Sequence, residues 1–147
     1  MSEAAVVPIE ILLVEDDPGD AYLTVLALQQ SKLQNTINVV NDGEQAMARL
    51  RLEPPYQQTR RPDLILLDLN LPRKSGLEVL AEVKQDPLLQ TIPVVVLTTS
   101  NRAEDIQGAY DLHANAYVSK PVELDHFLQA IRALDEFFLA VVRRPET

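Results

Sequence analysis

The chain has 147 residues and a formal net charge of −9, and its 46% hydrophobic and 24% charged residues are typical of one soluble globular domain. Its 13 basic residues against 22 acidic ones leave no surplus positive charge for phosphates, so we expect no direct binding of nucleic acid. The sequence has no cysteine, which excludes disulfides and thiolate-bound metals, and it has no apolar run of membrane-spanning length, so we expect a cytoplasmic protein without membrane attachment.

The first predicted elements are a strand and a helix. Residues 9–14 are apolar apart from Glu10 and are predicted to form a strand. Asp17 is predicted to cap a helix that begins at Pro18 and runs to about Lys32, because proline is favoured at the first helical position. The side chains expected on the buried face of this helix are Leu23, Leu26 and either Ala27 or Leu28.

The middle of the chain repeats this alternation. A strand over residues 36–40 is predicted to lead through a turn at Asp42 into a second helix, and residues 53–62 form a polar loop. Residues 64–67 are an unbroken apolar run, which is typical of a strand buried on both faces of a parallel sheet. Ser75 is predicted to cap the third helix.

The last third of the chain supplies the remaining elements. Strands are predicted over residues 92–97 and 116–119, and helices over residues 102–113 and 122–142. Five strands alternating with five helices predict an α/β fold, a doubly wound parallel sheet with strand order 2-1-3-4-5 over residues 9–142. A disordered lead over residues 1–8 and a short tail over residues 143–147 are expected at the ends.

Polar side chains follow the carboxyl ends of four predicted strands. They are Glu15 and Asp16 after the first strand, Asp68 after the third, Thr98 after the fourth and Lys120 after the fifth. In an open α/β sheet ligands bind at this edge, so we expect these side chains to converge. Three carboxylates in contact repel one another by about 4 kcal/mol per pair, which a hard cation such as Mg²⁺ would relieve.

This set of groups suits chemistry on a phosphoryl group. A carboxylate can attack phosphorus while a cation, an ammonium group and a hydroxyl group stabilise the charge on the phosphoryl oxygens. Asp68 has the central position and is the predicted acceptor, with Lys120 and Thr98 beside it.

Four segments carry a specific resemblance: ILLVEDD (11–17), LILLDLNLP (64–72), VVVLTTS (94–100) and YVSKP (117–121). In this order and spacing the chain resembles a response-regulator receiver domain of the CheY type, which has a flavodoxin-like fold. It is most similar to the stand-alone regulators that serve cyanobacterial phytochromes. The resemblance implies a non-enzyme signalling protein that accepts a phosphoryl group from a histidine kinase and slowly dephosphorylates itself, and whose output passes through a partner protein not yet identified.

The resemblance also implies roles for single residues. One departure is Thr99, which stands where the family usually has a small residue and whose bulk would narrow access to the acceptor. The implied roles are phosphoacceptor for Asp68, Mg²⁺ ligands for Asp16, Asp68 and Glu15, a backbone metal ligand for Asn70, switch residues for Thr98 and Tyr117, and phosphoryl contact for Lys120.

The predicted last helix carries an apolar stripe that is longer than the sheet requires. Phe137 and Phe138 lie beyond the part expected to pack on the sheet, and exposed phenylalanines would form an apolar patch. We therefore expect a homodimer through this helix, with Phe127 and Tyr110 also at the interface; local folding back onto the domain is the alternative.

Three other functions remain to be compared with this one. An aspartyl-phosphate phosphatase needs a second acid where the chain has Asn70, and a flavin carrier needs a phosphate loop where residues 15–17 are acidic. A degenerate receiver that acts only as a docking module is the third, and the full set of acidic, threonine and lysine residues argues against it.

Overall fold

A computed structural model describes residues 8–30, 34–99, 103–120 and 122–132 of the chain. Within these residues five strands form one sheet in the order β2-β1-β3-β4-β5, and every neighbouring pair is parallel. This confirms the predicted α/β fold and its strand order. The strands are β1 (Ile9–Val14), β2 (Asn35–Val40), β3 (Leu64–Asp68), β4 (Val94–Thr98) and β5 (Ala116–Ser119).

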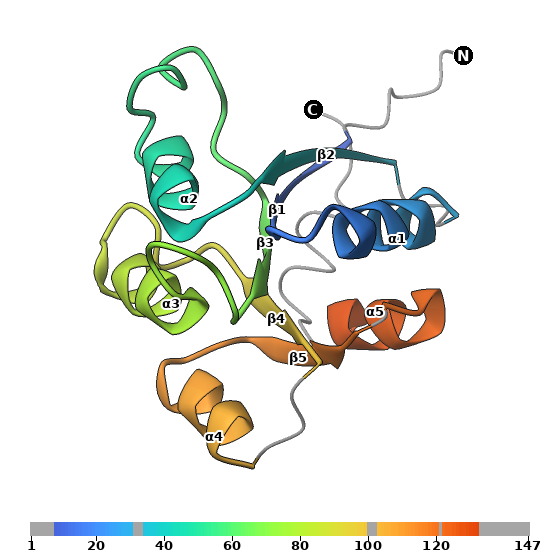
Figure 1. Cartoon of the computed structure of the whole chain (residues 1–147). Helices are drawn as coiled ribbons and strands as arrows, with labels where there is room; N and C mark the ends of the chain where they lie inside the picture. The colour runs from blue at the N-terminus through green and yellow to red at the C-terminus, as the bar shows by residue number, and fades with distance from the viewer. Residues whose placement is uncertain (1–7, 31–33, 100–102, 121, 133–147) are drawn as a thin grey trace, which may run out of the picture.

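The helices cover both faces of the sheet, as the doubly wound prediction requires. Figure 1 shows α1 and α5 on one face and α2, α3 and α4 on the other. Among the residues that the structure describes, no helix combines the length and the apolar character needed to cross a bilayer. The helices are α1 (Pro18–Gln29), α2 (Gly43–Leu50), α3 (Gly76–Gln85), α4 (Ala103–Asp111) and α5 (Leu124–Arg132).

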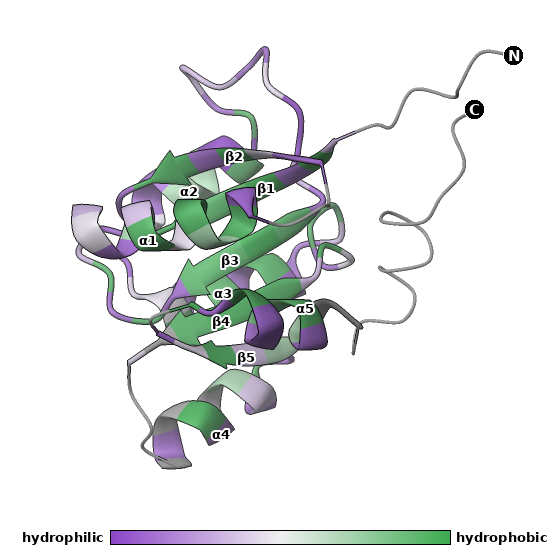
Figure 2. Cartoon of the chain, turned by 90° about the vertical axis from the view of Figure 1, so that its right-hand side faces the viewer, coloured by the Kyte–Doolittle hydropathy of each residue, from purple (hydrophilic) through white to green (hydrophobic). Residues whose placement is uncertain are grey.

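The core consists of two apolar layers, one on each face of the sheet. Alternate residues of the strands belong to opposite layers, so that Ile65 and Leu67 of β3 pack toward α2, α3 and α4, whereas Leu64 and Leu66 pack toward α1 and α5. All five residues of β3 are buried, and in Figure 2 this strand is coloured mainly as hydrophobic. The central strand therefore places Asp68 at the edge of the buried core.

The predicted helix caps are confirmed. The side chain of Asp17 accepts hydrogen bonds from the backbone amides of Gly19 and Asp20, and Asp42 accepts one from Gln45. Ser75 and Glu78 at the start of α3 exchange reciprocal hydrogen bonds, which form a capping box. These caps hold the first turns of the helices near the carboxyl ends of the strands.

The buried face of α1 differs from the prediction. Leu23 and Leu26 are 49% and 36% exposed, and the buried residues are Thr24, Ala27 and Leu28. Thr24 tolerates burial because its hydroxyl group donates to the carbonyl oxygen of Asp20 at 2.9 Å, which satisfies the polar group inside the helix. The apolar pattern alone therefore placed the buried face of α1 wrongly.

The fourth strand begins two residues later than predicted. The backbone amide of Ile92 donates to Leu89 within a turn, and Pro93 has no amide hydrogen to donate. Regular pairing with β3 starts at Val94, which lies opposite Ile65, and the strand runs on to Thr98.

The start of α3 lies directly against the end of β3. The amide of Gly76 donates to the carbonyl oxygen of Leu69 at 3.0 Å. A Cβ atom on Gly76 would lie 2.3 Å from the carbonyl oxygen of Asp68 and 2.6 Å from the Cα atom of Leu69. Only glycine permits this close approach, so Gly76 helps to fix the backbone that carries Asp68.

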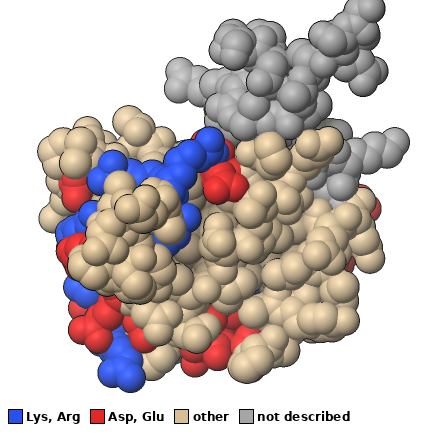
Figure 3. All heavy atoms as spheres, turned by 90° about the horizontal axis from the view of Figure 1, so that it is seen from above, with Lys and Arg blue, Asp and Glu red and all other residues tan. Residues whose placement is uncertain are grey.

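Arginine side chains fasten the polar loop after α2. Buried Arg49 donates to the carbonyl oxygen of Arg60 at 2.6 Å, and Arg61 donates to the carbonyl oxygen of Leu50 at 2.9 Å. The guanidinium group of Arg60 also pairs with Asp63 at 3.1 Å. Figure 3 views the molecule from above and shows basic side chains gathered on one part of that face, with acidic side chains beside them.

A lysine and an asparagine tie together three elements at the opposite end of the sheet from Asp68. The ammonium group of Lys84 at the end of α3 donates to the carbonyl oxygen of Ile92 at 3.1 Å and to Oδ1 of Asn115 at 3.0 Å. The same Oδ1 atom accepts from the amide of Val94 at 2.9 Å. Burial lowers the pKa of Lys84.

Candidate functional site

Strand register brings the predicted acidic residues together. Val14 of β1 lies opposite Leu67 of β3, so the residues that follow them, Glu15 and Asp68, emerge side by side at the carboxyl edge of the sheet. Asp68 in turn lies opposite Leu97 in β4. The candidate site therefore lies between β1 and β3, which is the switch point of the sheet.

Glu15, Asp16 and Asp68 form an acidic cluster. Each offers one carboxylate oxygen, and these oxygens all lie within 4.8 Å of one another. Glu15 and Asp68 are buried, whereas Asp16 is exposed. Hard oxygen ligands with one side open to solvent fit a divalent cation that keeps part of its hydration shell, so the three carboxylates could hold such an ion.

The ammonium group of Lys120 is the positive charge of the site. It lies 2.7 Å from Oε1 of Glu15, 2.9 Å from Oδ2 of Asp20 and 3.2 Å from Oδ2 of Asp68. The Lys120 side chain is only 6% exposed, so these charges interact with little screening by water. A buried cation beside a buried carboxylate is suited to hold an anionic group that becomes attached to that carboxylate.

The second oxygen of each buried carboxylate is held by the backbone. Oδ1 of Asp68 accepts a hydrogen bond from the amide of Asn70 at 3.1 Å, and Oε2 of Glu15 accepts one from the amide of Asp17 at 3.2 Å. In both carboxylates one oxygen is held by a backbone amide and the other by Lys120. These contacts fix the orientation of the carboxylates before any ligand binds.

Burial perturbs the acid–base behaviour of this cluster. Burial raises the pKa of Glu15 to about 7, with the hydrogen bond and charge of Asp68 adding to the rise, while Lys120 and the amide of Asp17 oppose it. Burial alone would lower the pKa of Lys120, but its carboxylate partners outweigh this and raise the pKa above its usual range. Lys120 therefore stays charged, whereas Glu15 titrates near neutral pH.

The raised pKa of Glu15 predicts a pH-dependent stability in the absence of metal. Between pH 5 and about 7 the folded protein holds a proton on Glu15 that the unfolded chain has already lost, so stability falls as the pH rises from 5 to 7.5. This can be measured by urea unfolding in EDTA at several pH values. Over this pH range the free energy of unfolding should fall by about 2 kcal/mol more in the wild type than in Glu15→Gln. Equal changes in the two proteins would contradict the raised pKa.

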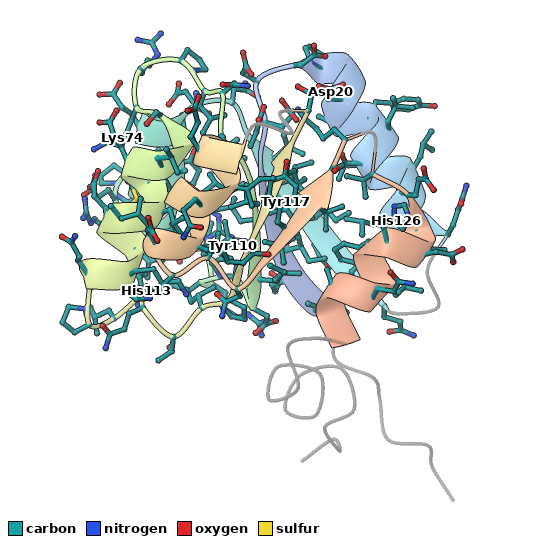
Figure 4. The ribbon with its side chains drawn as sticks, turned by 90° about the horizontal axis from the view of Figure 1, so that it is seen from below. Asp20, Lys74, Tyr110, His113, Tyr117 and His126 are labelled. Atoms are coloured by element: carbon teal, nitrogen blue, oxygen red, sulfur yellow. The ribbon has the colours of Figure 1, made fainter. Side chains whose placement is uncertain are left out.

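The other predicted site residues lie on β4, β5 and α4 and in the loop after β4. Thr98 ends β4 and pairs with Ser119 of β5, but its side chain is outside the described part of the structure. Thr99 is exposed, and Tyr117 packs partly buried against the core layer that faces α2, α3 and α4. In Figure 4 Tyr117 lies on β5, and Tyr110 lies on α4 with 47% of its surface exposed.

The predicted interface residues are only partly described. Phe137 and Phe138, with the predicted continuation of the last helix to residue 142, lie outside the described residues. Phe127 is 2% exposed and packs in the core layer beneath α1 and α5. Its assignment to a dimer interface is therefore wrong, because the domain itself already covers the side chain.

Sequence reasoning missed Asp20 as a member of the site. Asp20 lies in the first turn of α1, where a negative charge is favourable in any helix. Its carboxylate instead contacts Lys120, which is 100 residues away in the sequence. The only sequence signal was an acidic residue three positions after the capping Asp17, and helix-capping rules already accounted for it.

Comparisons with known proteins agree with this geometry. Residues 11–132 match the model of the response regulator receiver domain. Response regulator Rcp1 of Synechocystis sp. is 43% identical over 99% of this chain and 99% of its own length. The structure of the phosphorylated cyanobacterial phytochrome response regulator RcpA is 46% identical, with a TM-score of 0.78 over 96% of this chain and 100% of that chain.

Two further structures extend the comparison. The Mn²⁺-bound form of Rcp1 is 44% identical, with a TM-score of 0.76 over 92% of this chain and 97% of that chain. Chemotaxis response regulator CheY4 of Vibrio cholerae, at 23% identity and a TM-score of 0.69 over 86% of this chain and 98% of that chain, shares the fold. With its acidic cluster, its buried lysine and these relatives, the chain belongs to the response regulator receiver domain family.

Proposed function

We propose that the chain is a signalling switch in the cytoplasm that accepts a phosphoryl group on Asp68 from a histidine kinase of the phytochrome type. The main support is the position of Lys120. Its ammonium group lies 3.2 Å from the buried carboxylate of Asp68, which belongs to the acidic cluster. The similarity to RcpA, a cyanobacterial phytochrome response regulator, and to Rcp1 supports a kinase of the phytochrome type.

The transfer step uses the carboxylate of Asp68 as nucleophile. A bond forms from its oxygen to phosphorus while the bond from phosphorus to the histidine nitrogen breaks, and that electron pair stays with the imidazole of the kinase. Lys120 holds the phosphoryl oxygens as their charge shifts. When bound by Glu15, Asp16 and Asp68, and by the Asn70 carbonyl as the family resemblance implies, Mg²⁺ supplies further positive charge for these oxygens.

Phosphorylation is expected to change the surface of the domain. The hydroxyl group of Thr98 would hydrogen-bond the new phosphoryl group, and Tyr117 would turn inward, which alters the face of α4, β5 and α5 that a downstream partner protein reads. Slow hydrolysis of the phosphoaspartate would reset the switch. A docking module that takes no phosphoryl group is the alternative, and it would leave the arrangement of Lys120 and Asp68 without a use.

Phosphorylation of Asp68 can be tested by intact mass. Incubation with acetyl phosphate and Mg²⁺ should add the mass of one phosphoryl group to the wild type, and EDTA or Asp68→Asn should abolish the gain. Asp42→Asn is the matched control, because Asp42 is also buried and acidic but caps α2 outside the cluster. No gain in the wild type with either acetyl phosphate or a phosphorylated histidine kinase would leave the docking module as the better function.

We also infer a homodimer through the last helix and the neighbouring α4. Support comes from the exposed side chain of Tyr110, from the groove that it lines with Tyr117 and Ala130, and from the aromatic pair Phe137 and Phe138 in the sequence. Analytical ultracentrifugation should show a dimer that Phe137→Asp combined with Phe138→Asp converts to a monomer.

The control for the dimer experiment is Leu88→Asp. Leu88 is the most exposed of the large apolar side chains in the described residues, at 70%, and it lies in the turn between α3 and β4. This variant should remain dimeric. A monomeric wild type, or a dimer that survives both aspartate substitutions, would contradict the inferred interface.

A further inference from the structure

The ammonium group of Lys120 has three hydrogen atoms and three carboxylate acceptors. Glu15 and Asp68 are the buried acceptors, and their side chains are 0% and 5% exposed. The third is Asp20, whose side chain is 37% exposed and which is not part of the acidic cluster. Because an ammonium group can donate only three hydrogen bonds, each acceptor uses one of them.

Asp20 is held in this position by the first turn of α1. Its backbone amide donates to Oδ1 of Asp17 at 3.1 Å, and its carbonyl oxygen accepts from the hydroxyl group of Thr24 at 2.9 Å. In Figure 4 Asp20 lies at the start of α1, at the end of the molecule toward which the strands point. The helix cap is already supplied by Asp17, so the contact with Lys120 is an additional use of the Asp20 carboxylate.

We propose that Asp20 is a positioning residue that shares the ammonium group of Lys120 with Asp68 and thereby slows the phosphorylation of Asp68. The proposal rests on the phosphoacceptor function proposed above. A phosphoryl group on Asp68 needs hydrogen bonds from Lys120, and Asp20 occupies one donor at 2.9 Å, closer than Asp68 itself at 3.2 Å. Asp20 acts through Lys120 and does not touch the acceptor oxygen.

The negative charge of Asp20 should also slow the phosphorylation of Asp68. When all three are ionised, the cluster residues Glu15, Asp16 and Asp68 carry three negative charges, which Lys120 and one divalent cation can balance. Asp20 adds a fourth negative charge on the solvent side of Lys120, where an anionic phosphodonor would meet it and be repelled. Removing that charge should free one hydrogen-bond donor and reduce the repulsion at the same time.

The kinetic test compares matched variants with acetyl phosphate and saturating Mg²⁺. Asp20→Asn should become phosphorylated about fivefold faster than the wild type, as expected for a partly exposed ion pair. Asp20→Glu keeps the carboxylate and should stay within about twofold of the wild type. Glu123→Gln removes a negative charge three positions after Lys120, at a side chain that is 67% exposed and lies outside the acidic cluster, and it should also stay within about twofold.

Two kinetic outcomes would overturn the proposal. One is an Asp20→Asn rate equal to or below that of the wild type. The other is an equal acceleration in Glu123→Gln, because the effect would then come from general charge and not from Lys120. A wild type that takes no phosphoryl group would contradict the proposed function instead, and the two failures are therefore distinguishable.

A double-mutant cycle tests the shared contact without phosphorylation. Urea unfolding of the wild type, Asp20→Asn, Lys120→Met and the double variant should show strong non-additivity. Asp20→Asn should lower stability when Lys120 is present and should have almost no effect in the Lys120→Met background. Additive effects would show that Asp20 and Lys120 do not interact in solution, and this would overturn the proposal whatever the kinetics.

Discussion

Replacing Lys120 with methionine is expected to slow phosphorylation of Asp68 by about 100-fold or more. Lys120 is the only cation among the described side chains that the structure places within ion-pair distance of Asp68, and it is almost fully buried. In the loose transition state of phosphoryl transfer, charge is spread over the phosphoryl oxygens, and a fixed cation in a site with little water stabilises that charge. Methionine keeps most of the apolar stem but removes the charge.

The control is Lys84→Met. Lys84 is a partly buried lysine with several oxygen acceptors, but it lies at the opposite end of the sheet. This variant should lose stability yet keep a phosphorylation rate close to that of the wild type, measured by intact mass over time with acetyl phosphate. Similar rates for Lys120→Met and the wild type would show that Lys120 does not act on the phosphoryl group.

Replacing Gly76 with alanine is expected to lower the free energy of unfolding by about 3 kcal/mol. The new Cβ atom would meet the carbonyl oxygen of Asp68 at 2.3 Å and the Cα atom of Leu69 at 2.6 Å, and both belong to the backbone. No side-chain rotation can relieve this overlap, so α3 has to move away from the end of β3. The loss can be measured by urea unfolding.

Gly108→Ala provides the matched control for this substitution. Gly108 lies inside α4, and the nearest atom to a Cβ at this position is Cδ1 of Leu77 at 3.9 Å, an ordinary contact. Alanine is also the better helix former, so this variant should be as stable as the wild type or more stable by about 0.5–1 kcal/mol. Equal losses in Gly76→Ala and Gly108→Ala would contradict the proposed close contact.

Much of the fold could be predicted because its signals are local. The run from Leu64 to Leu67 has no polar residue, which is typical of a strand buried on both faces of a parallel sheet. Asp17 and Ser75 marked the starts of their helices because a side-chain oxygen can satisfy amides that the helix leaves free. The strand order then followed from the right-handed connections between parallel strands. This order places the ends of β1 and β3 side by side, and with them Glu15, Asp16 and Asp68.

The failures came from features that depend on how elements are rotated against each other. Thr24 is buried while Leu23 is exposed, because a hydrogen bond inside α1 makes a hydroxyl group tolerable in the core. Phe127 was assigned to an interface although α5 turns it into the core. The site role of Asp20 was missed, because its contact with Lys120 depends on how α1 faces the loop after β5.

The hydrogen bonds of Lys84 and Asn115 should limit where β4 and β5 can move when Asp68 is phosphorylated. It fastens the beginnings of β4 and β5 to the end of α3, whereas Thr98 and Lys120 lie at the far ends of the same two strands. These hydrogen bonds add to the pairing of β4 and β5 at that end, so we expect the two strands to separate more easily at the other end. Displacements that follow phosphorylation should therefore grow along β4 and β5, from almost none at Val94 to their largest at the phosphoryl group.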